Sequence, residues 1–253
     1  MVVVRNSTHY GTAGYYTALA TAHDMIGISG TNTRPAVAPT NGVENMLGTN
    51  PLAFGMPTDE AFSFGMDAAT SLAQRGKIEL YARLGKEIPA GWVIDENGKM
   101  LTDPKVALEG LTKGKAALTP MGGTNGDGHK GYGYATVVEI LSAALQQGNY
   151  LKMLTGMENG KKVPFRIGHF FIAINISSFT KPRLFKKTTG DILRALRASK
   201  KIPGQKRIYT AGEREYLTWL ERKNAGIPVK KALQEELLTI QKEQKLYRFK
   251  FPF

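Results

Sequence analysis

The segment from Gly168 to Asn175 constrains the fold of this chain most. Its apolar run, Phe170 to Ile174, has the length of a strand and is bounded by Gly168 and Asn175, so it predicts the central strand of a sheet. No apolar run approaches the roughly 18 residues that a membrane-spanning helix needs, and the N-terminus lacks the apolar core of a signal peptide. We therefore expect a soluble protein without a membrane partner.

The cysteine and histidine content narrows the chemistry. The chain of 253 residues can bury a full core as one large domain or two small ones. It contains no cysteine, which excludes disulfides, thiolate catalysis and cysteine metal sites and fits a reducing compartment. No two of its four histidines have the spacing of metal ligands. We expect a cytoplasmic protein with no metal site.

Positive charge is concentrated towards the C-terminus. Residues 1–150 carry 11 basic and 13 acidic side chains, whereas residues 151–253 carry 23 and 8, giving net charges of −2 and +15. Such an excess would suit a nucleic-acid partner, because Lys and Arg neutralise phosphates. No recognised nucleic-acid-binding module accompanies the charge. We interpret it instead as a solvated helix face or an attraction for an anionic cofactor and substrate.

Apolar spacing predicts alternating helices and strands. Helices are expected at 13–25, 69–84 and 132–147, strands at 26–29, 52–56 and 62–66, and three basic amphipathic helices near 182–199, 212–225 and 228–246. The turn signal between the strands at 52–56 and 62–66 favours an antiparallel pair. This order indicates an α/β protein with C-terminal helices.

A histidine-bearing turn near the N-terminus is the strongest candidate for chemistry. The run Asn6-Ser7-Thr8-His9-Tyr10-Gly11 follows the apolar residues Val2 to Val4, as a polar turn at the end of a strand. An imidazole with a pKa of about 6.5 can take a proton from an alcohol near neutral pH and return it. His169 lies at the start of the strand predicted at 168–175, and we interpret it as a structural histidine.

Two further segments allow more than one interpretation. Gly126 to Gly131 has the letters G-x-G-x-x-G, but no hydrophobic strand precedes it, so a Rossmann unit is not favoured. Lys130 and the start of the next helix would still suit an anion, and a surface loop with an exposed lysine is the alternative. Asp67 either caps the helix that follows it or accepts hydrogen bonds from a ribose.

A series of motifs resembles the malate/L-lactate dehydrogenase family, which also holds ureidoglycolate and sulfolactate dehydrogenases and diketogulonate reductase and is distinct from Rossmann-type lactate dehydrogenases. The motifs occur in family order along most of the chain. They are Asn6–Gly11, Ile26–Ile28, Thr31–Asn32, Leu47–Pro51, Met66–Ser71, Gly76–Ile78, Thr102–Pro104, His129–Gly133, Gly168–Ile174 and Ala211–Glu215.

The resemblance implies a fold and a set of site residues. The fold would be a non-Rossmann, nicotinamide-binding α/β domain with a mixed, largely antiparallel sheet flanked by helices, here residues 1–180, with a C-terminal helical segment, residues 181–253, packing back on it. His9 would be the proton acceptor and Thr33 a substrate contact. The cofactor, NAD with NADP as the alternative, would contact Asp67, Ala68, Ala69, Lys130, Gly131, Gly212, Glu213 and Arg214.

The implied reaction moves a hydride from C2 of a malate- or lactate-type hydroxy acid to the nicotinamide of a homodimeric enzyme. Members of this family usually begin with a further helical segment that carries a second active-site histidine and arginines for the substrate carboxylate, and this chain has no match to it. We therefore expect an N-terminally shortened dehydrogenase. A non-catalytic dinucleotide-binding remnant is the first alternative, and a basic nucleic-acid-binding protein is the second.

Overall fold

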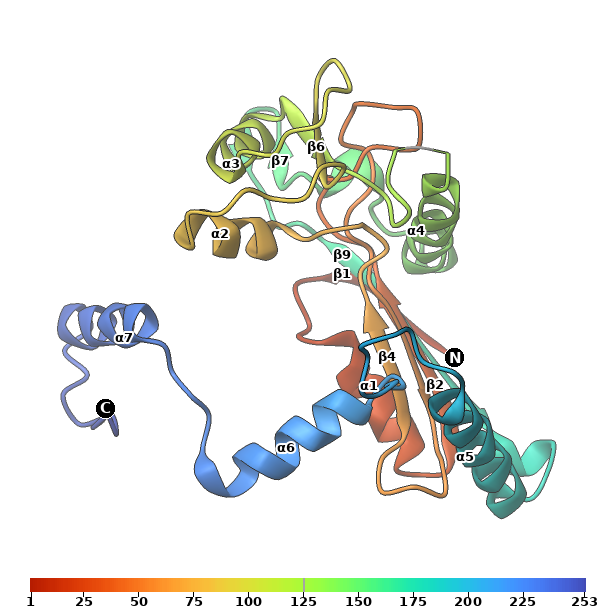
Figure 1. Cartoon of the computed structure of the whole chain (residues 1–253). Helices are drawn as coiled ribbons and strands as arrows, with labels where there is room; N and C mark the ends of the chain where they lie inside the picture. Colours follow the sequence, from red (N-terminus) through yellow and green to blue (C-terminus); the bar gives the residue numbers. More distant parts are fainter. Residues whose placement is uncertain (125) are drawn as a thin grey trace. The chain divides into compact units, whose positions relative to one another are not determined.

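A five-stranded antiparallel sheet forms the centre of the computed structural model, which describes residues 1–124 and 126–253 (Figure 1). The strand order is β1-β9-β2-β3-β4, and every neighbouring pair is antiparallel. The strands are β1 (Val2–Ser7), β9 (Ile167–Asn175), β2 (Met25–Thr31), β3 (Leu52–Met56) and β4 (Phe64–Ala68). This sheet agrees with the expected largely antiparallel fold. β9 is an interior strand, paired on both sides, but the central strand is β2 and not the expected segment 168–175.

Helix α1 (Ala13–Thr21) packs on a row of small residues across the sheet. Gly27 of β2 pairs with Gly55 of β3, which pairs with Gly65 of β4. A Cβ atom added to Gly27 would lie 2.8 Å from Thr17 Cα, and one on Gly55 would lie 2.9 Å from the Thr17 carbonyl oxygen. Because backbone meets backbone here, only glycine allows α1 to lie this close to the sheet.

The main hydrophobic core lies beside this sheet. It is surrounded by α2 (Arg75–Arg83), α3 (Pro104–Lys113), α4 (Gly128–Ala143) and the strand pair β5 (Val93–Asp95) and β6 (Ala116–Leu118). Its fully buried members include Ile78, Val93, Ala107 and Leu118. Shorter elements are η1 (Ala144–Gln146), η2 (Leu151–Leu154), η3 (Ile176–Ser178), β7 (Met157–Glu158) and β8 (Lys161–Lys162).

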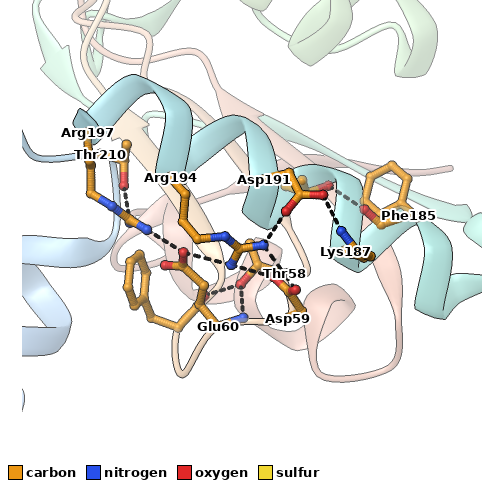
Figure 2. A network of polar contacts seen from close by, with 11 residues as sticks. Thr58, Asp59, Glu60, Phe185, Lys187, Asp191, Arg194, Arg197 and Thr210 are labelled. Atoms are coloured by element: carbon orange, nitrogen blue, oxygen red, sulfur yellow. Dashed lines mark hydrogen bonds and ion pairs between the residues drawn. The ribbon is translucent and has the colours of Figure 1, made fainter. Parts of the chain in front are cut away.

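Helix α5 (Pro182–Ala198) is fastened to the turn between β3 and β4 by ion pairs (Figure 2). Arg194 bonds both carboxylate oxygens of Asp59, at 3.0 and 3.1 Å, and Arg197 bonds Glu60. Gly190 makes room for this turn, because a Cβ there would lie 1.8 Å from Asp59 Oδ1. A two-point guanidinium–carboxylate pair fixes orientation as well as distance, so α5 is held against the β3–β4 turn.

The chain divides into two compact units, Met1–Gly212 and Glu213–Phe253. The sequence-based boundary at 180/181 therefore differs from the structural one, and α5 belongs to the first unit. The second unit contains α6 (Glu213–Ala225) and α7 (Lys231–Glu243), close to the helices expected there. Within the two described stretches of chain, every helix is too short or too polar to cross a lipid bilayer.

Candidate active site

The side chains of interest share the face of the sheet that α1 covers. In register, Thr31 lies opposite His169, and Ser29 lies opposite both Phe171 and Ala53. Ala53 in turn lies opposite Asp67. Because side chains alternate between the two faces of a strand, these residues belong to the same face as the glycine row beneath α1. The sheet thus brings Asp67 and His169 to one surface, although about 100 residues separate them in sequence.

Tyr10 is fixed on this surface by stacking and by a hydrogen bond. Its ring lies 4.2 Å from that of His169 and 4.9 Å from that of Tyr16, centroid to centroid. Its hydroxyl lies 3.2 Å from Ser29 Oγ. Burial raises the pKa of Tyr10 to about 12, and the hydrogen bond with Ser29 opposes this rise. Tyr10 therefore stays protonated at neutral pH and cannot accept a proton there.

His9 lies next to this fixed ring and is exposed. Its Nδ1 accepts a hydrogen bond from the Gly11 backbone N–H at 3.1 Å. In the neutral ring this contact places the proton on Nε2. A proton can therefore be added only at Nδ1 after the Gly11 contact opens, or at Nε2 after the ring changes tautomer, and both are accessible changes for an exposed side chain.

His169 is buried, with 2% of its surface exposed. Its Nδ1 lies 2.7 Å from Thr31 Oγ1, and the Thr31 hydroxyl is also close to the carbonyls of Gly168 and Asn32. Burial lowers the pKa of His169, the charge of His9 lowers it further, and the Thr8 backbone opposes them. His169 is therefore neutral at neutral pH and supports Tyr10, which agrees with a structural interpretation.

Asp67 has a partner that the sequence did not indicate. It lies in β4 rather than before a helix, and its Oδ2 accepts from the Gly14 N–H at 2.7 Å. The N-cap residue of α1, Thr12, makes no side-chain capping bond. Asp67 therefore serves as a tertiary cap for α1 and benefits from the positive end of its dipole. The alternative that Asp67 caps the helix after it is wrong, because that helix begins only at Arg75.

Three segments that are predicted to bind the cofactor are arranged along β4 and the chain that continues it. At the start of β4, the Gly65 N–H donates to the Ala211 carbonyl, and a Cβ on Gly212 would lie 2.6 Å from the Ser63 carbonyl oxygen. Asp67 and Ala68 end the strand. The chain after Ala69 then bonds to the segment that precedes α4, through Met121 N to the Thr70 carbonyl.

The N-terminus of α4 contacts that same segment. A Cβ on Gly131 would lie 2.3 Å from the Met121 carbonyl oxygen, so α4 approaches Met121 at a glycine. The first turn of α4 contains no acidic residue, and Asp127 makes no side-chain capping bond. Lys130 is exposed, with Asp127 at 3.4 Å as a weak partner. The N-terminus of a helix beside an exposed ammonium suits an anion.

A buried polar cluster next to these residues was missed by the sequence-based interpretation. Glu139 of α4 accepts hydrogen bonds from Asn32, Asn50 and the Leu151 N–H. Asn50 also accepts from the N–H of Thr33, the predicted substrate contact, at 3.0 Å. The available signal was a carboxylate at position 139 inside the apolar run 137–141 of the sequence. Within the described residues, no group of three or more His, Cys, Asp or Glu could hold a metal ion.

Comparison with known proteins identifies the family. The family model described as malate/L-lactate dehydrogenase matches residues 1–238. The chain belongs to the malate/L-lactate dehydrogenase family. A malate dehydrogenase of Pyrococcus abyssi is 42% identical over 239 residues, which are 94% of this chain and 64% of that protein. A malate/(S)-sulfolactate dehydrogenase of Methanothermus fervidus is 34% identical over 96% of this chain and 66% of its own length.

A solved member of the family has the same fold. The crystal structure of malate dehydrogenase from Entamoeba histolytica matches with a TM-score of 0.91 at 46% identity, over 99% of this chain and 69% of that one. The expected non-Rossmann α/β fold is thereby confirmed. This chain spans slightly less than two thirds of the two curated relatives named above.

Proposed function

We propose that this chain transfers a hydride between a 2-hydroxy acid of the malate or lactate type and a nicotinamide dinucleotide. The observation that supports this most is the alignment of three glycine- or aspartate-bearing segments along β4 and its continuation. The Gly212 backbone packs against Ser63 and Gly65 at the start of β4, and Asp67 lies near the end of the strand. Gly131 packs on Met121, which is bonded to the chain that continues β4. An extended ligand can contact all three.

The residues present fit the two polar parts of such a cofactor. Lys130 and the N–H groups at the start of α4 would hold its phosphates. Asp67, whose Oδ2 is bonded to Gly14, would offer Oδ1 to a ribose hydroxyl. Ala68 and Ala69 would contact it through the backbone, and Glu213 and Arg214, which begin the second unit, stay predicted contacts. We propose NAD as the cofactor, with NADP as the alternative.

His9 would handle the proton. A bound nicotinamide would supply the acceptor for the hydride that leaves C2 of the hydroxy acid. His9 takes the proton of the C2 hydroxyl, so a 2-oxo acid remains, and in the reverse direction the imidazolium returns that proton to the ketone. Such acid–base help is worth about 10² to 10⁴ in rate. Thr33 would position the substrate, and Tyr10, which stays protonated, would hold His9 in place.

Activity and binding measurements test this proposal together. Dinucleotide binding is measured by calorimetry with NADH and NADPH, and turnover by cofactor absorbance with malate and lactate. His9→Ala should lower turnover by about 10² to 10⁴ while leaving dinucleotide affinity unchanged. His23→Ala, at another exposed histidine, is the control and should match the wild type. Full activity in His9→Ala would remove His9 from the mechanism.

Several finer features belong to the same proposal. We propose malate before lactate, because relatives named malate dehydrogenase are 41–42% identical to the chain. We also propose that the protein is a cytoplasmic homodimer. Sedimentation equilibrium would measure its mass. Dinucleotide binding without turnover would instead favour a non-catalytic binding protein. A nucleic-acid-binding role is not favoured by these relatives.

A further inference from the structure

Glu139 is a buried carboxylate that the proposed chemistry does not use. It is 6% exposed, and its neighbours present three N–H donors to it. Oε2 accepts from Asn50 Nδ2 at 2.8 Å, and Oε1 accepts from the Leu151 N–H at 2.8 Å and from Asn32 Nδ2 at 3.4 Å. A carboxylate can only accept hydrogen bonds, so this surrounding matches the ionised group.

Asn32 and Asn50 connect Glu139 to the candidate site through hydrogen bonds. Each turns its NH₂ group towards the carboxylate and towards one backbone carbonyl, that of Ala135 for Asn50 and that of Asn149 for Asn32, which leaves its side-chain carbonyl oxygen facing the other way. Asn50 Oδ1 then accepts from the Thr33 N–H at 3.0 Å, and Asn32 Oδ1 accepts from the Gly168 N–H at 2.8 Å. Gly168 directly precedes His169, the ring beneath Tyr10.

Close packing around Thr33 makes its position sensitive to Asn50. A Cβ added to Gly48 would lie 1.9 Å from Thr33 Oγ1 and 2.7 Å from Asn50 Oδ1. Thr33, Gly48 and Asn50 therefore fit together without spare room, and a turned Asn50 amide would present its NH₂ group to the Thr33 N–H. Two donors facing each other at this distance would displace Thr33.

We propose that Glu139 is a positioning residue of the active site, which sets both asparagine amides and through them holds Thr33 for the substrate and Gly168 beneath the Tyr10–His169 stack. This inference rests on the proposed function for its catalytic meaning. In the proposed function, Glu139 contacts neither the substrate nor the cofactor. Burial raises the pKa of Glu139 and the three donors oppose that rise, so the donors are what keep the acceptor form in place.

The test replaces Glu139 by its neutral isostere, with a neighbour as control. Glu139→Gln puts an NH₂ group among donors, so it faces either the Asn50 NH₂ group or the Leu151 N–H and the Asn32 NH₂ group, and the asparagine on that side loses an acceptor. Ser142→Ala alters another buried polar residue on the same helix, whose hydroxyl has no hydrogen-bond partner among the described residues. Amide hydrogen exchange of the full chain, measured residue by residue by NMR, reports directly on the backbone N–H groups of Thr33 and Gly168.

Exchange at Thr33 or Gly168 should accelerate by about tenfold in Glu139→Gln, the effect of losing one hydrogen bond, while Ile28 in the middle of β2 stays protected. Ser142→Ala should change neither amide. The KM for the hydroxy acid should rise by about tenfold with dinucleotide affinity unchanged. Unchanged exchange at both amides, or equal loss of protection throughout β2, would overturn the proposal.

A second variant keeps the test decisive if Glu139→Gln does not fold. Asn50→Ala removes the acceptor for Thr33 alone, so exchange should accelerate at Thr33 and not at Gly168, with the same rise in KM. Faster exchange at neither amide would overturn the proposal. A wild-type chain that neither binds dinucleotide nor oxidises hydroxy acids would contradict the proposed function, and amide exchange would still show whether Glu139 orients Thr33 and Gly168.

Discussion

At the scale of single residues, the sequence neighbours His9 and Tyr10 differ in burial. Tyr10 is partly buried between two rings and keeps its proton, whereas His9 next to it is exposed. His169 beneath Tyr10 is buried and neutral. The exposed imidazole is therefore the ring of the three that a ligand can reach.

The lowered pKa of His169 makes stability depend on pH. Folding favours the neutral ring, so its contribution is present above the unfolded pKa of about 6.5 and is lost as pH falls from there to the folded pKa. The loss amounts to about 1.4 kcal/mol for each unit by which the pKa is lowered. We expect His169→Gln to lose less in Tm than the wild type between about pH 7.5 and 5.5.

The matched control for this measurement is His23→Gln, at an exposed histidine. It should follow the wild-type dependence of Tm on pH. If His169→Gln and the wild type lost the same amount of Tm, His169 would not be a buried neutral ring in solution.

Lys130 is available to a ligand at little cost. Its side chain is 67% exposed, and its ion pair with the exposed Asp127 is 3.4 Å long, so releasing it costs little. We expect Lys130→Ala to weaken NADH binding by about fivefold at low salt and by less at high salt, because exposed charges are screened. Calorimetry measures this, with Lys105→Ala as the control, and equal affinities for both variants would exclude Lys130 from the phosphate site.

At the scale of elements, the glycine row beneath α1 sets the distance between helix and sheet. We expect Gly27→Ala to destabilise the chain by about 1–3 kcal/mol, because its methyl group would meet the backbone of Thr17. Gly65→Ala lies in the same row, and a Cβ there has no atom within 4 Å. Urea unfolding compares the two. Equal losses would mean that the strands, rather than the approach of α1, require glycine.

Sequence patterns located most elements but could not show which contacts end them. The strand expected at 52–56 agrees with β3, because alternation and the Pro57 turn signal are both local. The helix expected from Ala69 begins only at Arg75. Thr70 and Leu72 bond to backbone far along the chain, Thr70 to Thr49 and Leu72 to Thr119, and these tertiary bonds replace the first turns of a helix.

In the candidate site too, the sequence indicated local motifs but not contacts between distant residues. The motif containing His9 and the lysine-bearing loop were visible in the sequence because each is local. The hydrogen bond from the Gly14 N–H to Asp67 joins residues 53 positions apart, and the bonds from Asn50 and Asn32 to Glu139 span 89 and 107 positions. No periodicity carries such pairings, since they arise only when the register of the sheet places β2, β3 and β4 side by side.

At the scale of the whole molecule, the long-range ion pairs of α5 explain why the first unit extends beyond the expected boundary. Arg194 and Arg197 bond to Asp59 and Glu60 more than 130 positions away. A basic helix alone indicates only a solvated face. Its acidic partners lie in a turn that sequence reasoning treated as a simple hairpin connection.

The hydrophobic core lies in the first unit, which leads to a final expectation. Every buried hydrophobic side chain of the described chain lies before Gly212, and α7 buries none of its residues. The chain has two tryptophans, the buried Trp92 in the first unit and the 57% exposed Trp219 in the second. Trp92 emission therefore reports the first unit once Trp219 is replaced.

We expect a chain that ends at Gly212 to unfold cooperatively, with the same Trp92 transition in urea as full-length Trp219→Phe, because the core that α2, α3 and α4 enclose is complete without residues 213–253. The slope of the unfolding free energy with urea should fall only slightly, since residues 213–253 are mostly exposed apart from Glu213 and add little newly exposed surface on unfolding. A broad, non-cooperative transition in the shortened chain would show that the second unit contributes to the core through contacts that its exposed side chains do not reveal.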